Sequence, residues 1–173
     1  NSHTMALKSD GTLWAWGNNS NGQLGDGGTS SYLTSPAQIG TDTTWVSVSA
    51  GGNHTVALKS DGTLWAWGYN GQGQLGDGTT TNQPSPVQIG TEATWVAISA
   101  GSSHTMAVKS DGTVWAWGYN GQGQLGDSTT VYKTSPIQPI LSTTAPTAPT
   151  GLTATAVSTS RIDLAWVDPS DNE

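Results

Sequence analysis

The sequence predicts an all-β fold: a partial β-propeller of about three four-stranded blades, the first incomplete, followed by a truncated β-sandwich module. Three observations predict this fold. A segment reading H-T-x-A-[LV]-K-S-D-G-T-[LV]-W-A-W-G begins at His3, His54 and His104, and a period near 50 residues indicates stacked supersecondary units. Each unit alternates β-forming runs with turn residues. Tryptophan occurs nine times and phenylalanine never, so indole rings must supply much of the buried apolar area.

Each unit reads as four short strands, and the second unit illustrates them. Residues 45–50 (WVSVSA) and 54–60 (HTVALKS) are rich in β-formers, and residues 63–68 (TLWAWG) form the third run. A long polar loop follows. We expect a short outer strand around residues 86–89, where proline suits a sheet edge because it cannot donate to a ladder.

The turns between these runs favour antiparallel sheets. Asp61-Gly62 separates the second run from the third, and this dipeptide predicts a two-residue hairpin turn with positive φ. Such turns impose antiparallel meanders, so a solenoid of β-hairpins is the weaker alternative to a propeller. Two units are complete, at about 45–89 and 95–138, and we expect the unit at about 1–40 to lack its innermost strand.

Both faces of each predicted sheet are apolar. Strand alternation places Trp65 and Trp67 on one face of the third strand, with Leu64 and Ala66 on the other. A sheet that is apolar on both faces must be covered on both sides, and blades packed face to face around an axis provide that cover. Aromatic side chains can also stack sugars or bases, but the alternation favours a core role for these tryptophans.

The repeated motifs G-x-x-H-T, D-G-x-[VL]-x-x-W-G and G-Q-L-G resemble the repeat of the regulator of chromosome condensation family, over residues 1 to about 140. The resemblance implies a blade of about 50 residues and a closed ring of about seven blades. Three blades alone expose apolar faces at both ends, so we expect them not to fold cooperatively as a monomer. The repeat positions that we expect to be structural are His3, His54, His104, Trp16, Trp67, Trp117, Gly25, Gly76 and Gly126.

Composition excludes several classes of function. The net charge is −7 and the sequence pI is about 4.5, which argues against a nucleic-acid partner. There is no cysteine, so disulfides, thiolate metal sites and thiol catalysis are excluded together. No stretch is apolar enough to span a bilayer, so we expect no membrane insertion in this segment.

One motif imitates a dinucleotide-binding loop. The stretch GQGQLG at residues 71–76 has the spacing G-x-G-x-x-G and recurs at residues 121–126. The fingerprint needs a helix that opens at its last glycine, yet a polar, turn-rich segment follows. Ser20 replaces the first glycine in the first unit. We therefore expect structural glycines and no bound nucleotide.

Other candidate chemistry is also better explained by structure. We expect each of the three histidines to bond backbone at the start of the second strand and not to bind a metal. The repeated Ser-Asp-Gly reads as a hairpin turn, since no histidine accompanies it in the motif. Asp26, Asp77 and Asp127 are candidates for cation binding, although turn capping by the side chain is the simpler interpretation. The sequence predicts no cofactor, no metal and no enzyme activity.

Differences between the repeats indicate where a partner would bind. The side chains of the repeats differ most just before the outer strand, at residues 31–34, 81–84 and 131–134. A second difference lies between residues 52–53 of one unit and residues 102–103 of the next. Strand alternation places both spots at one end of the blades, opposite the Asp-Gly turns. We expect Tyr32 and Tyr132 to act as anchors, because tyrosine suits interfaces; drift in unconstrained loops is the alternative. The predicted partner-binding positions are Tyr32, Leu33, Asn53, Asn82, Gln83, Ser103, Tyr132 and Lys133.

The chain changes character after the repeats. Residues 141–149 read as a Pro/Thr linker, which is extended and poorly able to pack. Residues 150–173 resemble the opening of a fibronectin type III domain, with Trp166 as the core tryptophan of its second strand. About 25 residues are present where a β-sandwich needs about 100. The resemblance implies an extracellular or cell-surface bacterial multidomain protein.

The leading functional hypothesis is a non-catalytic propeller segment that binds a protein, or a surface glycan, through its loops. The first alternative is a guanine-nucleotide-exchange type of regulator of a small GTPase, which the resemblance implies for the namesake of the family. A structural spacer in a surface protein is the second alternative. An enzyme with an axial propeller site is the third, since the repeats offer no paired acid and base beyond structural positions.

Overall fold

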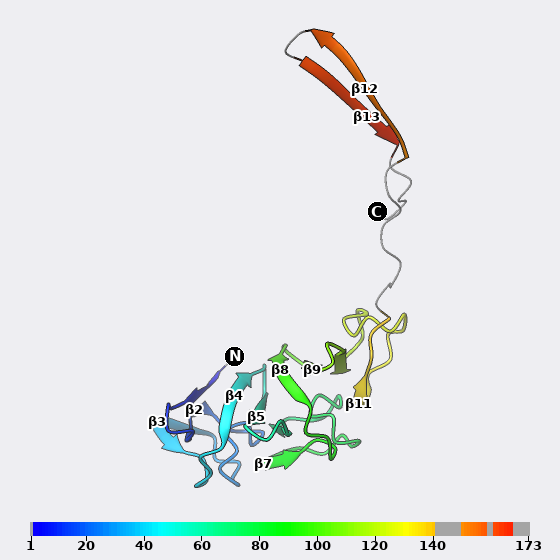
Figure 1. Cartoon of the computed structure of the whole chain (residues 1–173). Coiled ribbons are helices and arrows are strands. Elements are labelled where there is room, and N and C mark those ends of the chain that lie inside the picture. The colour runs from blue at the N-terminus through cyan, green and yellow to red at the C-terminus, as the bar shows by residue number, and fades with distance from the viewer. Residues whose placement is uncertain (1, 141–149, 159–160, 168–173) are drawn as a thin grey trace. The chain divides into compact units, whose positions relative to one another are not determined.

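The computed structural model describes residues 2–140, 150–158 and 161–167, and every element in them is a β-strand. The chain divides into two compact units, Asn1–Ile140 and Leu141–Glu173 (Figure 1). The described residues contain no helix with the length and apolarity to cross a membrane. The strands of the first unit are β1 (His3–Leu7), β2 (Leu13–Asn18), β3 (Tyr32–Gln38), β4 (Trp45–Ala50), β5 (His54–Lys59), β6 (Leu64–Gly68), β7 (Gln83–Gln88), β8 (Trp95–Ala100), β9 (His104–Lys109), β10 (Val114–Gly118) and β11 (Lys133–Ile137).

These strands form three antiparallel sheets in which sequential strands are neighbours. Blade 1 contains β1, β2 and β3, blade 2 contains β4 to β7, and blade 3 contains β8 to β11. Each sheet is thus a meander, and blade 1 has three strands where the other blades have four. The sheets confirm the predicted all-β class and the blade of four short strands.

Blade 2 is covered on both faces, as the alternation predicted. One buried cluster joins Leu13 of blade 1 to Trp67 of blade 2, and a second joins Leu64 of blade 2 to Trp117 of blade 3. Aromatic rings meet edge to face within each cluster, and the ring centroids of Trp45 and Trp67 are 6.0 Å apart. Such pairs add to the stabilisation from burial alone. The tryptophans therefore build the core between blades.

The hairpin turn differs from the predicted two-residue form. The amide of Lys59 donates to the carbonyl of Thr63 at 3.1 Å, so three residues form the loop. Gly62 has φ of +80°, whereas Asp61 does not adopt positive φ. The Asp61 carboxylate instead accepts hydrogen bonds from the amide and hydroxyl of Thr63, at 3.0 and 2.7 Å. This side-chain bonding stabilises a three-residue turn that ends in a left-handed glycine.

The outer strand also differs from its prediction around residues 86–89. Strand β7 begins at Gln83, and its pairing places Gln83 opposite Gly68 and Val87 opposite Ala66, with a register shift between the two pairs. An edge strand needs donors on one side only, so prolines within it do not prevent pairing. The strand consequently extends toward the loop that precedes it.

The second unit contains one hairpin among its described residues. Strand β12 (Thr150–Ser158) pairs with the antiparallel strand β13 (Arg161–Val167). The predicted linker at residues 141–149 lies outside the described residues. The fibronectin type III module over residues 150–173 stays a prediction.

Candidate functional site

The loops that vary between repeats open at one end of the blades. In an antiparallel meander the first-to-second and third-to-fourth connections lie at the same end, and the hairpin turn between the second and third strands lies at the other. We call the first end the loop face. It comprises residues 19–31 of blade 1, residues 51–53 and 69–82 of blade 2, and residues 101–103 and 119–132 of blade 3, together with the adjoining first residues of the outer strands β3, β7 and β11.

The predicted anchors on the loop face are exposed. Tyr32 is 65% exposed and Tyr132 is 50% exposed, and Val131 beside Tyr132 is 60% exposed. The two tyrosines lie on blades 1 and 3, with blade 2 between them, so they are not brought together. Asn53 is also exposed, and Ser103 is half-buried. The variable positions therefore present separate exposed side chains along the loop face.

Four of the predicted loop residues lie in outer strands rather than in loops. Tyr32 and Leu33 belong to β3, Gln83 to β7 and Lys133 to β11, because these strands begin earlier than the proline pattern suggested. Asn82 precedes its strand, and its side-chain oxygen accepts the Asn70 amide at 2.9 Å. That bond holds the loop of blade 2, so Asn82 serves the scaffold.

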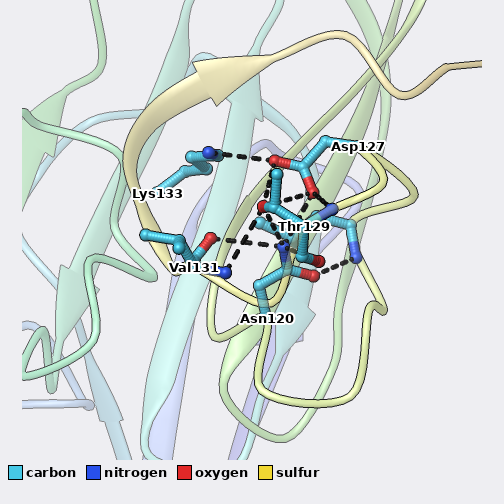
Figure 2. A network of polar contacts seen from close by, with 6 residues as sticks. Asn120, Asp127, Thr129, Val131 and Lys133 are labelled. Carbon is cyan, nitrogen blue, oxygen red and sulfur yellow. Dashed lines mark hydrogen bonds and ion pairs between the residues drawn. The ribbon is translucent and has the colours of Figure 1, made fainter.

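A buried asparagine organises each third-to-fourth loop, and the sequence reasoning missed it. Asn120 is fully buried, and its side-chain amide donates to Asp127 at 2.9 Å and to the carbonyl of Thr129 at 2.9 Å (Figure 2). Its side-chain oxygen accepts the amide of Leu125 at 3.0 Å. One side chain thus fixes three points of a polar loop. The signal was available, because the asparagine recurs as Asn19, Asn70 and Asn120.

The aspartates that follow G-Q-L-G cap turns, in agreement with the simpler interpretation of them. In blade 3 the carboxylate of Asp127 accepts the Thr129 amide at 3.0 Å and lies 2.9 Å from the ammonium of Lys133 (Figure 2). The hydrogen bond from Lys133 is the main reason that the pKa of Asp127 lies well below its usual range. Leu33 and Gln83 take the place of Lys133 in the other blades. The blades therefore differ in charge beside an otherwise repeated loop.

Two of the three repeated histidines, His3 and His54, join neighbouring blades, and for these two the expectation of a backbone bond was wrong. Nε2 of His3 lies 3.0 Å from the hydroxyl of Thr55, and Nε2 of His54 lies 3.0 Å from that of Thr105. The Thr55 hydroxyl donates its one proton to the carbonyl of Gln23 at 2.8 Å. It must therefore accept from His3, which places a proton on Nε2 of that imidazole.

Burial keeps these imidazoles neutral. Burial is the main cause that lowers the pKa of His54 to about 3 and that of His3 to about 4. Nδ1 of each ring is buried and has no hydrogen-bond partner among the described residues. No group of three or more His, Asp or Glu side chains in the described part of the chain is placed to hold a metal ion.

The glycines of the G-Q-L-G motif allow the loops to approach the next blade. Gly25 has φ of +82°, and a Cβ at this position would lie 2.7 Å from Nε1 of Trp67. Gly76 has φ of +81°, and a Cβ at this position would lie 2.6 Å from Nε1 of Trp117. A side chain at either position would strain the backbone, because φ is positive, and would collide with the indole ring of the next blade. Turns and irregular chain follow Gly76, so the helix that a dinucleotide site needs does not follow this motif.

The opposite end of the blades carries a caged lysine that the sequence reasoning also missed. The ammonium of Lys59 lies 4.8 and 4.0 Å from the ring centroids of Trp45 and Trp65, and 2.6 Å from the carboxylate of Asp42. The hydrogen bond from Lys59 is the main cause that lowers the pKa of Asp42 to about 2. The ammonium of Lys59 is held by a carboxylate and two aromatic rings. It therefore stabilises the fold through cation–π contact and is not placed to act as a reactive amine.

The same cage in blade 3 borders a cleft between blades 2 and 3. Lys109 lies 4.9 and 4.0 Å from the ring centroids of Trp95 and Trp115 and pairs with Glu92 at 2.5 Å. The cleft has a volume of about 460 Å³, and Asp77 is also part of its wall. It contains no nucleophile paired with a base, so nothing in it resembles a catalytic arrangement.

Comparison with known families supports the repeat assignment. The model of the regulator of chromosome condensation (RCC1) repeat matches residues 10–58, 61–108 and 111–158, and a second model of that repeat matches residues 45–74 and 95–124. The first two matches of the first model each cover the last two strands of one blade and the first two of the next. The third continues to residue 158, beyond the predicted end of the propeller.

Individual relatives share part of the chain. It is 42% identical over 77 residues to the X-linked retinitis pigmentosa GTPase regulator homolog of Caenorhabditis elegans, covering 43% of this chain and 6% of that protein. It is 41% identical over 78 residues to the human probable E3 ubiquitin-protein ligase HERC3, covering 44% of this chain and 7% of that protein. The chain thus spans less than a tenth of the length of these two relatives.

A solved structure shows the same architecture. The crystal structure of Prp20p from Saccharomyces cerevisiae, described together with its binding properties to Gsp1p and histones, superposes with a TM-score of 0.73. The two sequences are 23% identical, and the match covers 80% of this chain and 36% of that one. At this identity the likeness concerns the fold, and it confirms a partial propeller. Because the family model matches more than half of its residues, the chain belongs to the regulator of chromosome condensation repeat family.

Proposed function

We propose that the chain is a non-catalytic propeller segment that binds a protein partner through its loop face. The observation that carries this proposal is the exposure of Tyr32, at the start of β3, and of Tyr132, just before β11. Each follows a loop that a buried asparagine holds in place. Large, rigid side chains on a preformed scaffold bind with little loss of conformational entropy. Loops on such scaffolds are where recognition usually resides.

The kind of protein that contains this segment is part of the proposal. The resemblance of residues 150–173 to a fibronectin type III opening supports a secreted or cell-surface multidomain protein. The related Prp20p, by contrast, is described with binding to Gsp1p and histones. The net charge of −7 disfavours nucleic acid and favours a partner with basic or neutral surface. A surface glycan remains the alternative ligand, because exposed aromatic rings also stack on sugars.

A capture experiment with a matched control tests the loop face. The chain is immobilised, proteins retained from an extract of the source organism are identified, and the most enriched protein is purified and bound again. We expect Tyr32→Ala with Tyr132→Ala to weaken this binding at least tenfold, since tyrosine anchors commonly contribute 2 kcal/mol or more, roughly. The control is Val46→Ala with Val96→Ala, which truncates two exposed apolar residues that lie outside the loop face.

The outcomes separate the competing functions. Equal binding by wild type and the tyrosine variant would show that the loop face is not the binding surface. Retention of no protein by the wild type would favour the spacer role. Loss of binding after glycosidase treatment of the extract would identify a glycan, and an accelerated nucleotide release from a captured GTPase would support the exchange-factor alternative.

A further inference from the structure

The cleft between blades 2 and 3 has an acidic lining. Its volume is about 460 Å³, and every lining residue belongs to blade 2, to blade 3 or to the segment between them. Asp77 of blade 2 and Glu92 of the connecting segment contribute carboxylates, and Lys109 contributes an ammonium. That ammonium already pairs with Glu92 and lies against two indole rings. Two carboxylates against one ammonium leave one negative charge without a counter-charge, and it belongs to Asp77.

The two oxygens of the Asp77 carboxylate have different surroundings. Oδ1 accepts hydrogen bonds from the side-chain amide of Asn70 at 3.0 Å and from the amide and hydroxyl of Thr79 at 2.9 and 2.8 Å. Among the described residues, Oδ2 accepts only from Nε2 of Gln83, at 3.4 Å. Hydrogen bonds from nitrogen to oxygen are usually no longer than about 3.2 Å, so this contact is weak. Oδ1 therefore holds the loop, and Oδ2 is available to a ligand.

Blade 3 shows which kind of group this carboxylate binds. Lys133 takes the place of Gln83 there, and its ammonium lies 2.9 Å from Oδ2 of Asp127 (Figure 2). Asp127 otherwise repeats the bonds of Asp77, since its Oδ1 also accepts from the equivalent asparagine and threonine. The ammonium that blade 3 carries within its own chain thus marks a position where blade 2 carries no cation.

We propose that the cleft between blades 2 and 3 binds a basic side chain, lysine or arginine, of a protein partner, with Oδ2 of Asp77 as the acceptor. Charge complementarity selects this occupant, because the chain has a net charge of −7 and the lining has an excess of carboxylate. Hydrogen bonds between charged groups are shorter and stronger than neutral ones, so an ammonium or guanidinium replaces the long contact from Gln83 favourably. Glu92, whose side chain is 55% exposed, adds negative charge elsewhere in the lining.

An NMR titration of the chain with the capped peptide acetyl-Gly-Arg-Gly-amide tests this binding. We expect saturable shifts of the backbone amides of Asp77 and Glu92 and of the indole N–H of Trp115, all of which belong to lining residues. The same peptide with glutamine in place of arginine should give no saturable shift, because it has no charge. Equal binding of the two peptides, or an absence of saturable shifts at these three positions, would overturn the proposal.

Gln83→Lys copies blade 3 and supplies an internal ammonium while the carboxylate of Asp77 stays in place. We expect this variant to bind the arginine peptide about fivefold more weakly, as for loss of a partly exposed ion pair. The matched control is Gln122→Lys, the same substitution at an exposed position of blade 3 outside the lining. Both variants change the net charge equally, so equal weakening would indicate general repulsion of the peptide and would overturn the assignment to Asp77.

A second variant removes the charge and leaves the site open. Asp77→Asn retains a side-chain oxygen that can accept from Asn70 and Thr79, so the loop keeps its bonds. It should weaken binding of the arginine peptide as much as Gln83→Lys does, and an unchanged affinity would exclude Asp77 as the acceptor.

The tyrosine variant separates this site from the tyrosine anchors of the loop face. Neither Tyr32 nor Tyr132 belongs to the lining of the cleft, so Tyr32→Ala with Tyr132→Ala should leave the affinity for the arginine peptide unchanged. A loss of peptide binding in this variant would assign the peptide to the tyrosine surface and overturn the proposal. Either binding surface can therefore fail its test while the other one holds.

Discussion

A threonine hydroxyl is the residue-scale link between blades. Thr55 is fully buried; its hydroxyl donates its single proton to the carbonyl of Gln23 and accepts a hydrogen bond from His3. This arrangement fixes the proton of His3 on Nε2 and leaves Nδ1 without a donor or acceptor. A second proton on that ring would be buried without a partner, which burial strongly disfavours.

Acid should therefore weaken the fold before carboxylates titrate. The unfolded chain binds a proton at His54 near pH 6.5, but the folded chain binds it only near pH 3, so stability is lost as pH falls between these values. Between neutral pH and pH 5 this one histidine lowers the free energy of unfolding by about 2 kcal/mol. The lowered pKa of Asp42, about 2, also stabilises the fold, but that stabilisation is lost only as the pH falls below about 4.

Urea unfolding at about pH 7, 6 and 5 measures this loss, and NMR titration of the imidazoles assigns it. We expect the His54 resonance to stay in its neutral position throughout that range. A free energy of unfolding that is constant from pH 7 to 5, or a His54 pKa near 6.5, contradicts the prediction.

The sequence identified the histidines as structural but misassigned their partner. A single unit shows the H-T pair and suggests a local bond, whereas the acceptor of His3 is Thr55, one repeat later. Such a contact depends on how blades stack, which no local pattern specifies. The buried asparagines were overlooked for a different reason, because an asparagine in a polar loop resembles an ordinary turn residue.

At the scale of elements, the four-strand meander was predictable and its turns were less so. Strand β4 spans the predicted residues 45–50, because a compact β-forming run and flanking turns mark both ends. Strand β7 begins at Gln83, three residues before the outer strand expected around residues 86–89. Pairing with Gly68 across a register shift decides that boundary, and such pairing is a tertiary effect.

One hairpin turn occurs in two surroundings, which permits a matched comparison. Gly62 and Gly112 have φ of +80° and +83°. A Cβ at Gly62 would lie 2.4 Å from the carbonyl oxygen of Ala93, whereas no described residue has an atom within 4 Å of a Cβ at Gly112. We expect Gly112→Ala to cost about 1 kcal/mol through left-handed strain alone. Gly62→Ala should cost about 2–4 kcal/mol, because backbone must also move.

Urea unfolding of both alanine variants measures the difference between these turns. The two substitutions share chemistry and backbone conformation, so the difference reports the contact between the turn of blade 2 and the segment leading to blade 3. Equal losses of stability would show that this segment yields freely and that blade-to-blade contact at this end is weak.

At the scale of the whole molecule, each blade depends on its neighbours for a core. Trp67 of blade 2 lies in a cluster with blade 1, and Trp117 of blade 3 lies in a cluster with blade 2. Stability is then a sum of blade terms and interface terms, as in other repeat proteins. The three described blades share two interfaces, and blade 2 takes part in both of them.

Thermal unfolding of the chain should consequently occur over a broad temperature range, because only two interfaces hold the three described blades together.

Calorimetry over a hundredfold range of protein concentration measures the breadth of this transition. A sharp, concentration-independent transition in the wild-type chain would instead show that three blades form a cooperative unit by themselves. In that case the two interfaces between the described blades suffice for cooperative unfolding of this propeller segment.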